Sequence, residues 1–197
     1  AFMTAQESST LSPGKIRALQ TTSTKGGIFM ILAADHRDSM RALINAADPS
    51  SVPAARLTEL KLALVKYIAP RASGVMLDPV YSAPQAIVDG ALPGNIGFLS
   101  ALEEQGYLGD PRSRQTTLLS GWSVAKAKRL GASGIKLLLF YHPDAGEATD
   151  RQEQTVRAVT TDCARYEIPL FLEPMAYSFD SRVPYGSREF ALQRRSI

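Results

Sequence analysis

Five short apolar segments of this chain each end in a charged or polar group. The segments alternate with stretches of helical spacing, and their ends read Ala34-Asp35-His36-Arg37, Leu77-Asp78-Pro79, Ala101-Leu102-Glu103-Glu104, Ile135-Lys136-Leu137 and Leu172-Glu173-Pro174. Strand and helix in regular succession indicate parallel strands joined by right-handed crossovers. In a closed barrel of such units, polar groups at the strand ends meet at one mouth and form the active site. The sequence therefore predicts an α/β enzyme with a (β/α)8 TIM-barrel fold, of which this chain supplies about five of the roughly eight units.

The boundaries of the expected elements follow from apolar periodicity and from Gly, Pro and Ser positions. The expected strands cover residues 28–34, 74–78, 96–102, 135–141 and 169–175. The expected helices cover 53–69, 81–90 and 120–130, followed by one opening with a Thr149/Gln152 capping box and one near Ser187. Ser50 or Ser51 is the expected cap of the first helix, Ser120 of the third, and 106–117 reads as a loop.

Two domain-level predictions follow from composition. Residues 1–24 are expected to be a flexible N-terminal segment, and 25–197 the N-terminal part of a barrel domain. The net charge of +3 is scattered rather than clustered, so a nucleic-acid partner is not expected. No apolar run approaches the roughly 18 residues of a membrane span. A single cysteine, Cys163, excludes an internal disulfide and reads as a core residue, so a cytoplasmic protein is expected.

Lys136 is the most informative single residue. The period of two along a strand places it on the same face as Leu138 and Phe140, which is the expected interior of the barrel. A buried ammonium must be paired or lose its proton, and a lysine with a lowered pKa is a nucleophile toward carbonyls or a proton relay. The alternative is a salt-bridged lysine at the strand end.

Other charged groups are expected to join Lys136 at the mouth. Glu173 is the candidate general acid/base, and it is expected to face Lys136, so an ion pair between the two is the alternative, and both can hold. Asp35 closes the longest apolar run, where a charge is costly unless it is satisfied. His36 and Arg37 follow it and could contact a phosphate.

The remaining polar residues give weaker signals. Asp78 could orient a group at the mouth or form a turn before Pro79. Glu103 and Glu104 could simply be exposed at the start of a short helix. With two histidines and no cysteine cluster, no metal site is expected.

Four of these segments carry a family resemblance. Residues 33–37, 77–81, 134–141 and 171–174 resemble, in order, the tagatose-1,6-bisphosphate aldolases, and the similarity runs from about Lys25 to Ile197. These are class I aldolases with a TIM barrel, related to the sulfofructose-phosphate aldolases. The resemblance implies cleavage of a ketohexose bisphosphate into dihydroxyacetone phosphate and glyceraldehyde 3-phosphate through a Schiff base, with no metal or other cofactor.

The resemblance also assigns roles by position. It implies that Glu173 shuttles protons, that Lys136 contacts substrate hydroxyls, and that Asp35 with its neighbour lines the site. His36 stands where the family often has Gln. The family's Schiff-base lysine lies on the sixth strand, and its phosphate-binding loops follow strands seven and eight. Residues 1–197 contain neither, so this chain alone is expected to be inactive.

Three alternatives stay open at this point. From its residues alone the chain offers Lys136 as the Schiff-base lysine. A sibling aldolase for a sulfonated sugar phosphate is a second possibility, and a non-catalytic sugar-phosphate-binding fragment is a third. Homo-oligomers are also expected, because five strands without closure leave two open sheet edges.

Overall fold

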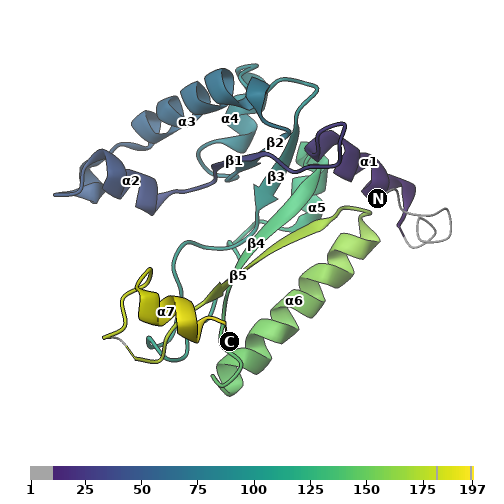
Figure 1. Cartoon of the computed structure of the whole chain (residues 1–197). Coiled ribbons are helices and arrows are strands. Elements are labelled where there is room, and N and C mark those ends of the chain that lie inside the picture. The colour runs from purple at the N-terminus through teal and green to yellow at the C-terminus, as the bar shows by residue number, and fades with distance from the viewer. Residues whose placement is uncertain (1–10, 181, 196) are drawn as a thin grey trace.

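Five parallel strands form a single sheet in the order β1-β2-β3-β4-β5. The computed structural model describes residues 11–180, 182–195 and 197. The strands are β1 (Ile31–Ala34), β2 (Gly74–Leu77), β3 (Gly97–Ala101), β4 (Gly134–Tyr141) and β5 (Leu170–Ala176). Each strand pairs with the next along the chain, as the alternating pattern predicts (Figure 1).

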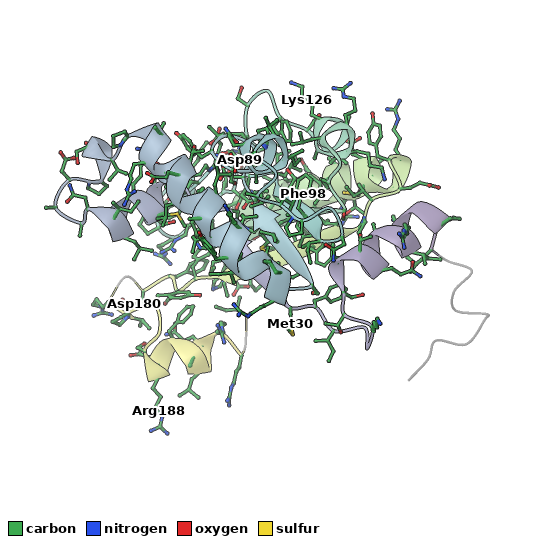
Figure 2. The ribbon with its side chains drawn as sticks, turned by 90° about the horizontal axis from the view of Figure 1, so that it is seen from above. Met30, Asp89, Phe98, Lys126, Asp180 and Arg188 are labelled. Atoms are coloured by element: carbon green, nitrogen blue, oxygen red, sulfur yellow. The ribbon has the colours of Figure 1, made fainter. Side chains whose placement is uncertain are left out.

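Helices join the successive strands, a further helix precedes β1, and another follows β5. They are α1 (Pro13–Thr22), α2 (Asp38–Ile44), α3 (Ala54–Ile68), α4 (Ala83–Val88), α5 (Val124–Leu130), α6 (Glu147–Arg165) and α7 (Arg188–Gln193), with short 3-10 turns η2 (Pro49–Ser51) and η3 (Ala69–Arg71). Helix α3 packs on β1 and α4, and α6 packs on β4 and α5. Figure 2 shows Arg188 of α7 pointing away from the sheet. Among the described residues, no helix is both long and apolar enough to cross a membrane.

The hydrophobic core lies between the outer face of the sheet and the helices. Val75, Leu77, Ile135 and Leu137 alternate along their strands and are fully buried in this layer. Burial of such a side chain contributes roughly 1.5–3 kcal/mol relative to exposure. Cys163 of α6 belongs to the same core, where burial raises the pKa of its thiol to about 11. The core assignment of this cysteine is confirmed.

The sheet is curved into part of a barrel. Adjacent strands lie about 4.8 Å apart, so β1 and β4 of a flat sheet would be separated by about 14 Å. Asp35, directly after β1, nevertheless contacts Lys136 of β4. Phe29, before β1, meets Phe171 of β5 edge to face with ring centroids 5.4 Å apart. Both contacts require a concave inner face, and the prediction of a TIM-barrel architecture is confirmed for these five units.

Several element boundaries differ from the sequence prediction. Strand β1 begins at Ile31 because its register starts opposite Gly74, the first residue of β2, so residues 28–30 have no strand beside them. Helix α5 is capped by Ser123 and not Ser120, since the Ser123 hydroxyl accepts a hydrogen bond from the Lys126 amide at 3.2 Å. Residues 106–117 contain one antiparallel backbone pair, Leu108 with Gln115.

The predicted caps of two other helices are wrong as well. Ser50 and Ser51 belong to η2, and Pro53 holds the N-cap position of α3. Helix α6 begins at Glu147, inside which Thr149 donates a hydrogen bond to the His142 carbonyl at 2.6 Å. The expected capping box is therefore absent, because Thr149 serves the preceding loop. Helix α2 has no counterpart among the predicted elements.

Helix α1 corrects the prediction that residues 1–24 are flexible. Ser12 caps the helix, and Pro13 occupies its first position, where a missing amide costs nothing. Ala18 and Thr22 are buried, and the helix contacts β2 and β3. Residues 13–22 are thus part of the packed fold. The part of that prediction concerning residues 1–10 lies outside the described residues.

The two outer strands make association an expected property of the 197-residue chain. β1 and β5 each have one strand neighbour, and Phe29, Met30 and Leu172 near these edges are 48%, 51% and 42% exposed. Unpaired edges with apolar side chains promote strand pairing between chains. We expect light scattering at micromolar concentration to show species larger than the monomer, and fewer of them in a Met30→Lys variant. A monodisperse monomer would contradict this prediction.

Candidate functional site

A cavity of about 690 Å³ opens on the concave face, at the carboxyl ends of the strands. Side chains alternate along a strand, and the inward set of β4 is Lys136, Leu138 and Phe140. The inward set of β5 includes Phe171 and Glu173. All five line the cavity, so the predicted interior face of β4 is confirmed. The cavity has a charged part around Lys136 and an apolar part that includes Leu138 and Phe140.

Lys136 sits at the centre of a carboxylate cluster. Its Nζ lies 2.8 Å from Asp35 Oδ2, 2.5 Å from Glu103 Oε1 and 3.5 Å from Glu173 Oε2. Lys136 is 5% exposed, and the side chains of Asp35 and Glu103 are 9% and 8% exposed. The predicted approach of Lys136 and Glu173 is confirmed, and Asp35 joins them as expected. Charge-assisted hydrogen bonds in such a buried setting are strong and fix the ammonium in place.

The protonation of Lys136 follows from these partners. Burial lowers the pKa of its ammonium, but the charges and hydrogen bonds of Glu103 and Asp35 outweigh burial and raise that pKa above its ordinary value of 10.5. The ammonium therefore keeps its proton throughout the physiological range. A protonated amine has no lone pair for attack on a carbonyl. The idea of Lys136 as a lysine with a lowered pKa is wrong, and the paired alternative is correct.

Asp35 is expected to make the free energy of unfolding depend on pH in the acidic range. Burial raises the pKa of its carboxyl, but the Lys136 charge and hydrogen bond prevail and hold the pKa below 3.8. A pKa lowered in the folded state gives stability that is present above the unfolded-state value and lost as pH falls through the folded-state value. We expect the free energy of unfolding in urea to fall as pH drops below about 4, with a weaker dependence in an Asp35→Asn variant. An equal slope in both proteins would contradict this linkage.

Glu173 differs from the other two carboxylates in its exposure. Its side chain is 50% exposed, while those of Asp35 and Glu103 are almost buried. It stands on β5 opposite Leu138 in register, one residue before Pro174. A carboxylate that touches both the buried ammonium and the open cavity can exchange a proton with a bound molecule.

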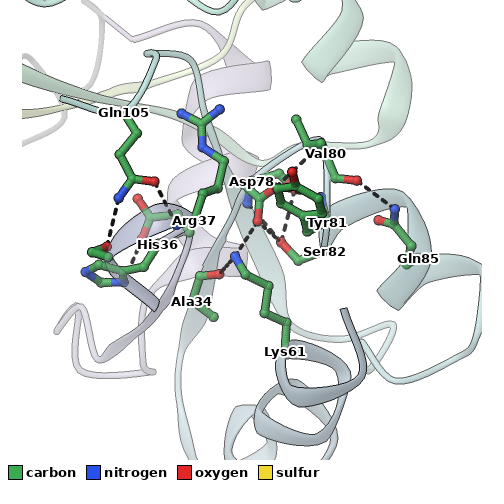
Figure 3. Close-up of polar contacts among 12 residues, drawn as sticks. Ala34, His36, Arg37, Lys61, Asp78, Val80, Tyr81, Ser82, Gln85 and Gln105 are labelled. Carbon is green, nitrogen blue, oxygen red and sulfur yellow. Dashed lines mark hydrogen bonds and ion pairs between the residues drawn. The ribbon is translucent and has the colours of Figure 1, made fainter. Parts of the chain in front are cut away.

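Arg37 and His36 occupy the loop after β1 in different ways. Arg37 is nearly buried, and its Nη2 donates to the Glu103 carbonyl at 2.7 Å, while Nη1 lies 3.6 Å from Glu104 Oε2. The amide oxygen of Gln105 accepts the Arg37 backbone N–H at 3.0 Å (Figure 3). Arg37 thus joins the β1 loop to the β3 loop, and it still lines the cavity. His36 also lines the cavity, with its side chain 52% exposed.

Asp78 is not among the residues that line the cavity. Its Oδ1 accepts the backbone N–H groups of Val80 and Tyr81 at 2.9 and 2.7 Å, and its Oδ2 accepts the Ser82 hydroxyl and forms an ion pair with Lys61 (Figure 3). Asp78 and Lys61 are both completely buried. The turn-forming interpretation of Asp78 is therefore the one that the geometry bears out, and both of its carboxylate oxygens are engaged within the protein.

Sequence reasoning missed the importance of Glu103 and Lys61. Glu103 is two residues after Ala101 and therefore shares the inward face of β3. Lys61 lies four residues after Leu57 and four before Val65, both buried on the packed face of α3. A charge in register with a buried face must have a partner, and this signal identifies both residues. Lys61 Nζ also donates to the Ala34 carbonyl at 2.8 Å, directly before Asp35.

The acidic groups of the cluster are engaged by the Lys136 ammonium. In the described part of the chain, no group of three or more His, Cys, Asp or Glu side chains is arranged to hold a metal ion. What the arrangement offers is a fixed positive charge, a partly exposed carboxylate beside it, and a cavity with apolar walls. Such a site can position a polar, hydroxyl-bearing molecule and move a proton on it.

Comparisons with known proteins agree on one family. The family model of the DeoC/LacD aldolases matches residues 29–183. A tagatose 1,6-diphosphate aldolase of Enterococcus faecalis is 34% identical over 169 residues, which are 85% of this chain and 50% of that protein. One of Lactococcus lactis is 31% identical over 182 residues, or 92% and 55% of the two chains. The chain spans about half the length of the curated relatives it matches.

A solved structure supports the same fold. A Schiff-base-forming fructose-1,6-bisphosphate aldolase superposes with a TM-score of 0.53 at 17% sequence identity, covering 85% of this chain and 60% of that one. The match of the family model, residues 29–183, contains all four strand-end segments that carry the resemblance. This chain belongs to the DeoC/LacD family of aldolases.

Proposed function

We propose that the chain is the N-terminal part of a class I aldolase that cleaves a ketohexose bisphosphate such as tagatose 1,6-bisphosphate. The products would be dihydroxyacetone phosphate and glyceraldehyde 3-phosphate. The observation that carries the proposal is the Lys136 ammonium held by Asp35, Glu103 and Glu173 at the mouth of the barrel. It is supported by relatives named tagatose 1,6-diphosphate aldolase at about 30% identity. A cytoplasmic location is part of the proposal.

In this proposal Lys136 orients the substrate. A charged ammonium donates hydrogen bonds to hydroxyl or carbonyl oxygens, and the cluster holds it in a fixed position. Its pKa, which Glu103 and Asp35 raise, favours this orienting role over that of an attacking amine. Asp35 keeps the ammonium charged and in place, with His36 beside it at the cavity wall.

Glu173 is the proposed proton shuttle. Cleavage of a carbon–carbon bond next to an iminium requires removal of the proton from the hydroxyl that becomes the aldehyde, and the carbanion-like product must later be protonated. The Glu173 side chain is half exposed, and its Oε2 lies 3.5 Å from the Lys136 ammonium. It can therefore accept the first proton and return one later.

The Schiff-base amine is proposed to come from a part of the protein that residues 1–197 do not contain. Of the lysines in the described residues, Lys136 is the one that lines the cavity, and it is protonated. Lys61 is buried against Asp78. The Enterococcus faecalis and Lactococcus lactis relatives are both about twice as long as the matched region.

A coupled assay of triose phosphate release tests this function. The protein to compare with the 197-residue chain is an extended chain, which consists of residues 1–197 followed by the remaining part of the Lactococcus lactis relative. We expect cleavage of tagatose 1,6-bisphosphate by the extended chain and none by the 197-residue chain, because covalent catalysis requires a positioned amine. Absence of cleavage by a folded extended chain would contradict the proposal. A turnover by the 197-residue chain that Lys136→Ala abolishes would show that Lys136 is the nucleophile.

A further inference from the structure

Arg114 lies close to three aromatic rings, of which one, Phe140, lines the cavity. Its guanidinium carbon is 4.8 Å from the ring centroid of Tyr107, 4.9 Å from that of Tyr177 and 5.9 Å from that of Phe140. The Nε of Arg114 donates to the Pro111 carbonyl at 3.1 Å. No carboxylate of the described residues forms an ion pair with it, and neither terminal nitrogen has a hydrogen bond to that part of the protein. An arginine that lies against aromatic rings and has no hydrogen bond from its two terminal nitrogens to the described residues can receive an anion.

The position of Arg114 relates it to the Lys136 cluster. Phe140 lines the cavity four residues after Lys136 on the inward face of β4, which corresponds to roughly 13 Å along the strand. Gly106, which precedes Tyr107, lines the cavity too. Tyr107, Tyr177 and Arg114 itself are not among the lining residues, so Arg114 is placed beside the Phe140 end of the cavity through its contact with that ring.

We propose that Arg114 binds a phosphate group of the substrate, at the end of the sugar that lies away from Lys136. The inference rests on the proposed function and names a binding residue for it. A guanidinium presents two parallel N–H groups that match the geometry of phosphate oxygens. Because three rings already restrict the side chain, little of its conformational freedom is lost on binding.

The acidic residue in the loop of Arg114, Asp110, is not its partner, which leaves the guanidinium available to an external anion. Asp110 accepts the backbone N–H of Arg112 at 2.7 Å and the Ser113 hydroxyl at 2.8 Å, so its oxygens are engaged within the turn. Arg112 lies over the Phe179 ring at 5.3 Å and adds a second positive charge nearby. Both arginines come from the 106–117 segment, which sequence reasoning treated only as a loop.

The test follows the Arg114 Nε–H signal by NMR while inorganic phosphate is added to the 197-residue chain. We expect this signal to shift saturably with phosphate, while the Nε–H signal of Arg165 in the same protein does not shift. The matched control is Arg165→Gln, which removes an exposed arginine that lies over a single ring, Tyr166, at the end of α6. In calorimetric titration, Arg114→Gln should weaken the binding of tagatose 1,6-bisphosphate about 10- to 100-fold, and Arg165→Gln should not change it. Arg114→Lys, which keeps the charge and loses the fork, should fall between the two.

The outcomes separate the subsite from the proposed function. Equal affinity of wild type, Arg114→Gln and Arg114→Lys for the bisphosphate would overturn the Arg114 subsite and leave the function standing. A phosphate-dependent shift at Arg114 without any binding of the bisphosphate would keep an anion site and overturn its assignment as a substrate subsite. Binding of neither ligand to the folded chain would overturn the Arg114 site, whereas triose phosphate release by the extended chain decides the function separately. If Arg114→Gln is unfolded by circular dichroism, Arg114→Lys carries the comparison.

Discussion

Replacement of Glu173 by Gln is expected to lower the kcat of the extended chain by about 10²- to 10⁴-fold, the usual contribution of a positioned general acid/base. Glutamine preserves the size of the side chain and can still accept a hydrogen bond from Lys136, but it cannot take up a proton. Substrate affinity should change little, since the cavity and the ammonium are retained. The measurement is steady-state kinetics of triose phosphate release in the coupled assay.

The matched control for Glu173→Gln is Glu147→Gln, which removes an 88% exposed carboxylate at the start of α6. That variant should retain the kcat of the parent protein. A kcat of Glu173→Gln within about threefold of the parent would assign the proton transfer to another group. A rise in KM with unchanged kcat would instead assign Glu173 to substrate binding.

Replacement of Lys61 by Met is expected to lower the free energy of unfolding by about 3–5 kcal/mol, the usual cost of removing one partner of a buried ion pair. Asp78 would keep a buried charge without its counter-ion, and the Ala34 carbonyl would lose its donor. Urea unfolding followed by circular dichroism measures the change. Lys66→Met, on the exposed side of the same helix, should remain within about 0.5 kcal/mol of the parent.

A second substitution distinguishes loss of the pair from loss of packing. In Lys61→Met with Asp78→Asn, the uncompensated charge is gone, and the amide oxygen can still accept the backbone N–H groups of Val80 and Tyr81. The double variant should be more stable than Lys61→Met alone. If it is less stable, the effect of Lys61 lies in packing and the ion pair contributes little.

The structure links this ion pair to the functional site. Lys61 holds the carbonyl of Ala34, and the next residue, Asp35, contacts the Lys136 ammonium. We therefore expect Lys61 to influence the position of Asp35 through the end of β1. In Lys61→Met, the pH dependence of the free energy of unfolding that we attribute to Asp35 should therefore change. If Lys61 affects stability without affecting Asp35, that pH dependence will be the same as in the parent protein.

The sequence was sufficient for the sheet order and for most of the site because both follow from short periodicities. Alternation along β4 placed Lys136 inward, and strand-end positions placed Asp35 and Glu173 beside it. Glu103 was undervalued, since one sequence cannot distinguish a strand that continues from a helix that begins. Its depth in the cluster depends on the curvature of the whole sheet, which no local pattern encodes.

Other errors have a similar physical origin. Helix α1 has few apolar residues, and its burial depends on β2 and β3, which are distant in sequence. Asp78 ends a strand as the site residues do, but the chain turns there into α4, and its carboxylate closes that turn. Arg114 lies in a segment without periodicity, and the rings around it come from three separate segments. Tertiary contacts of this kind decide function and are invisible to local patterns.

Borohydride trapping with dihydroxyacetone phosphate, followed by peptide mass spectrometry, tests most directly whether Lys136 is a charged orienting group in a class I aldolase site. Borohydride reduces an iminium to a stable secondary amine, so the modified lysine is identified by its peptide. We predict no reduced adduct on Lys136 in either the 197-residue or the extended chain, and an adduct on a lysine beyond residue 197 in the extended chain. A reduced adduct on Lys136 would show that this residue forms the Schiff base and would contradict its assignment as a permanently charged, orienting ammonium.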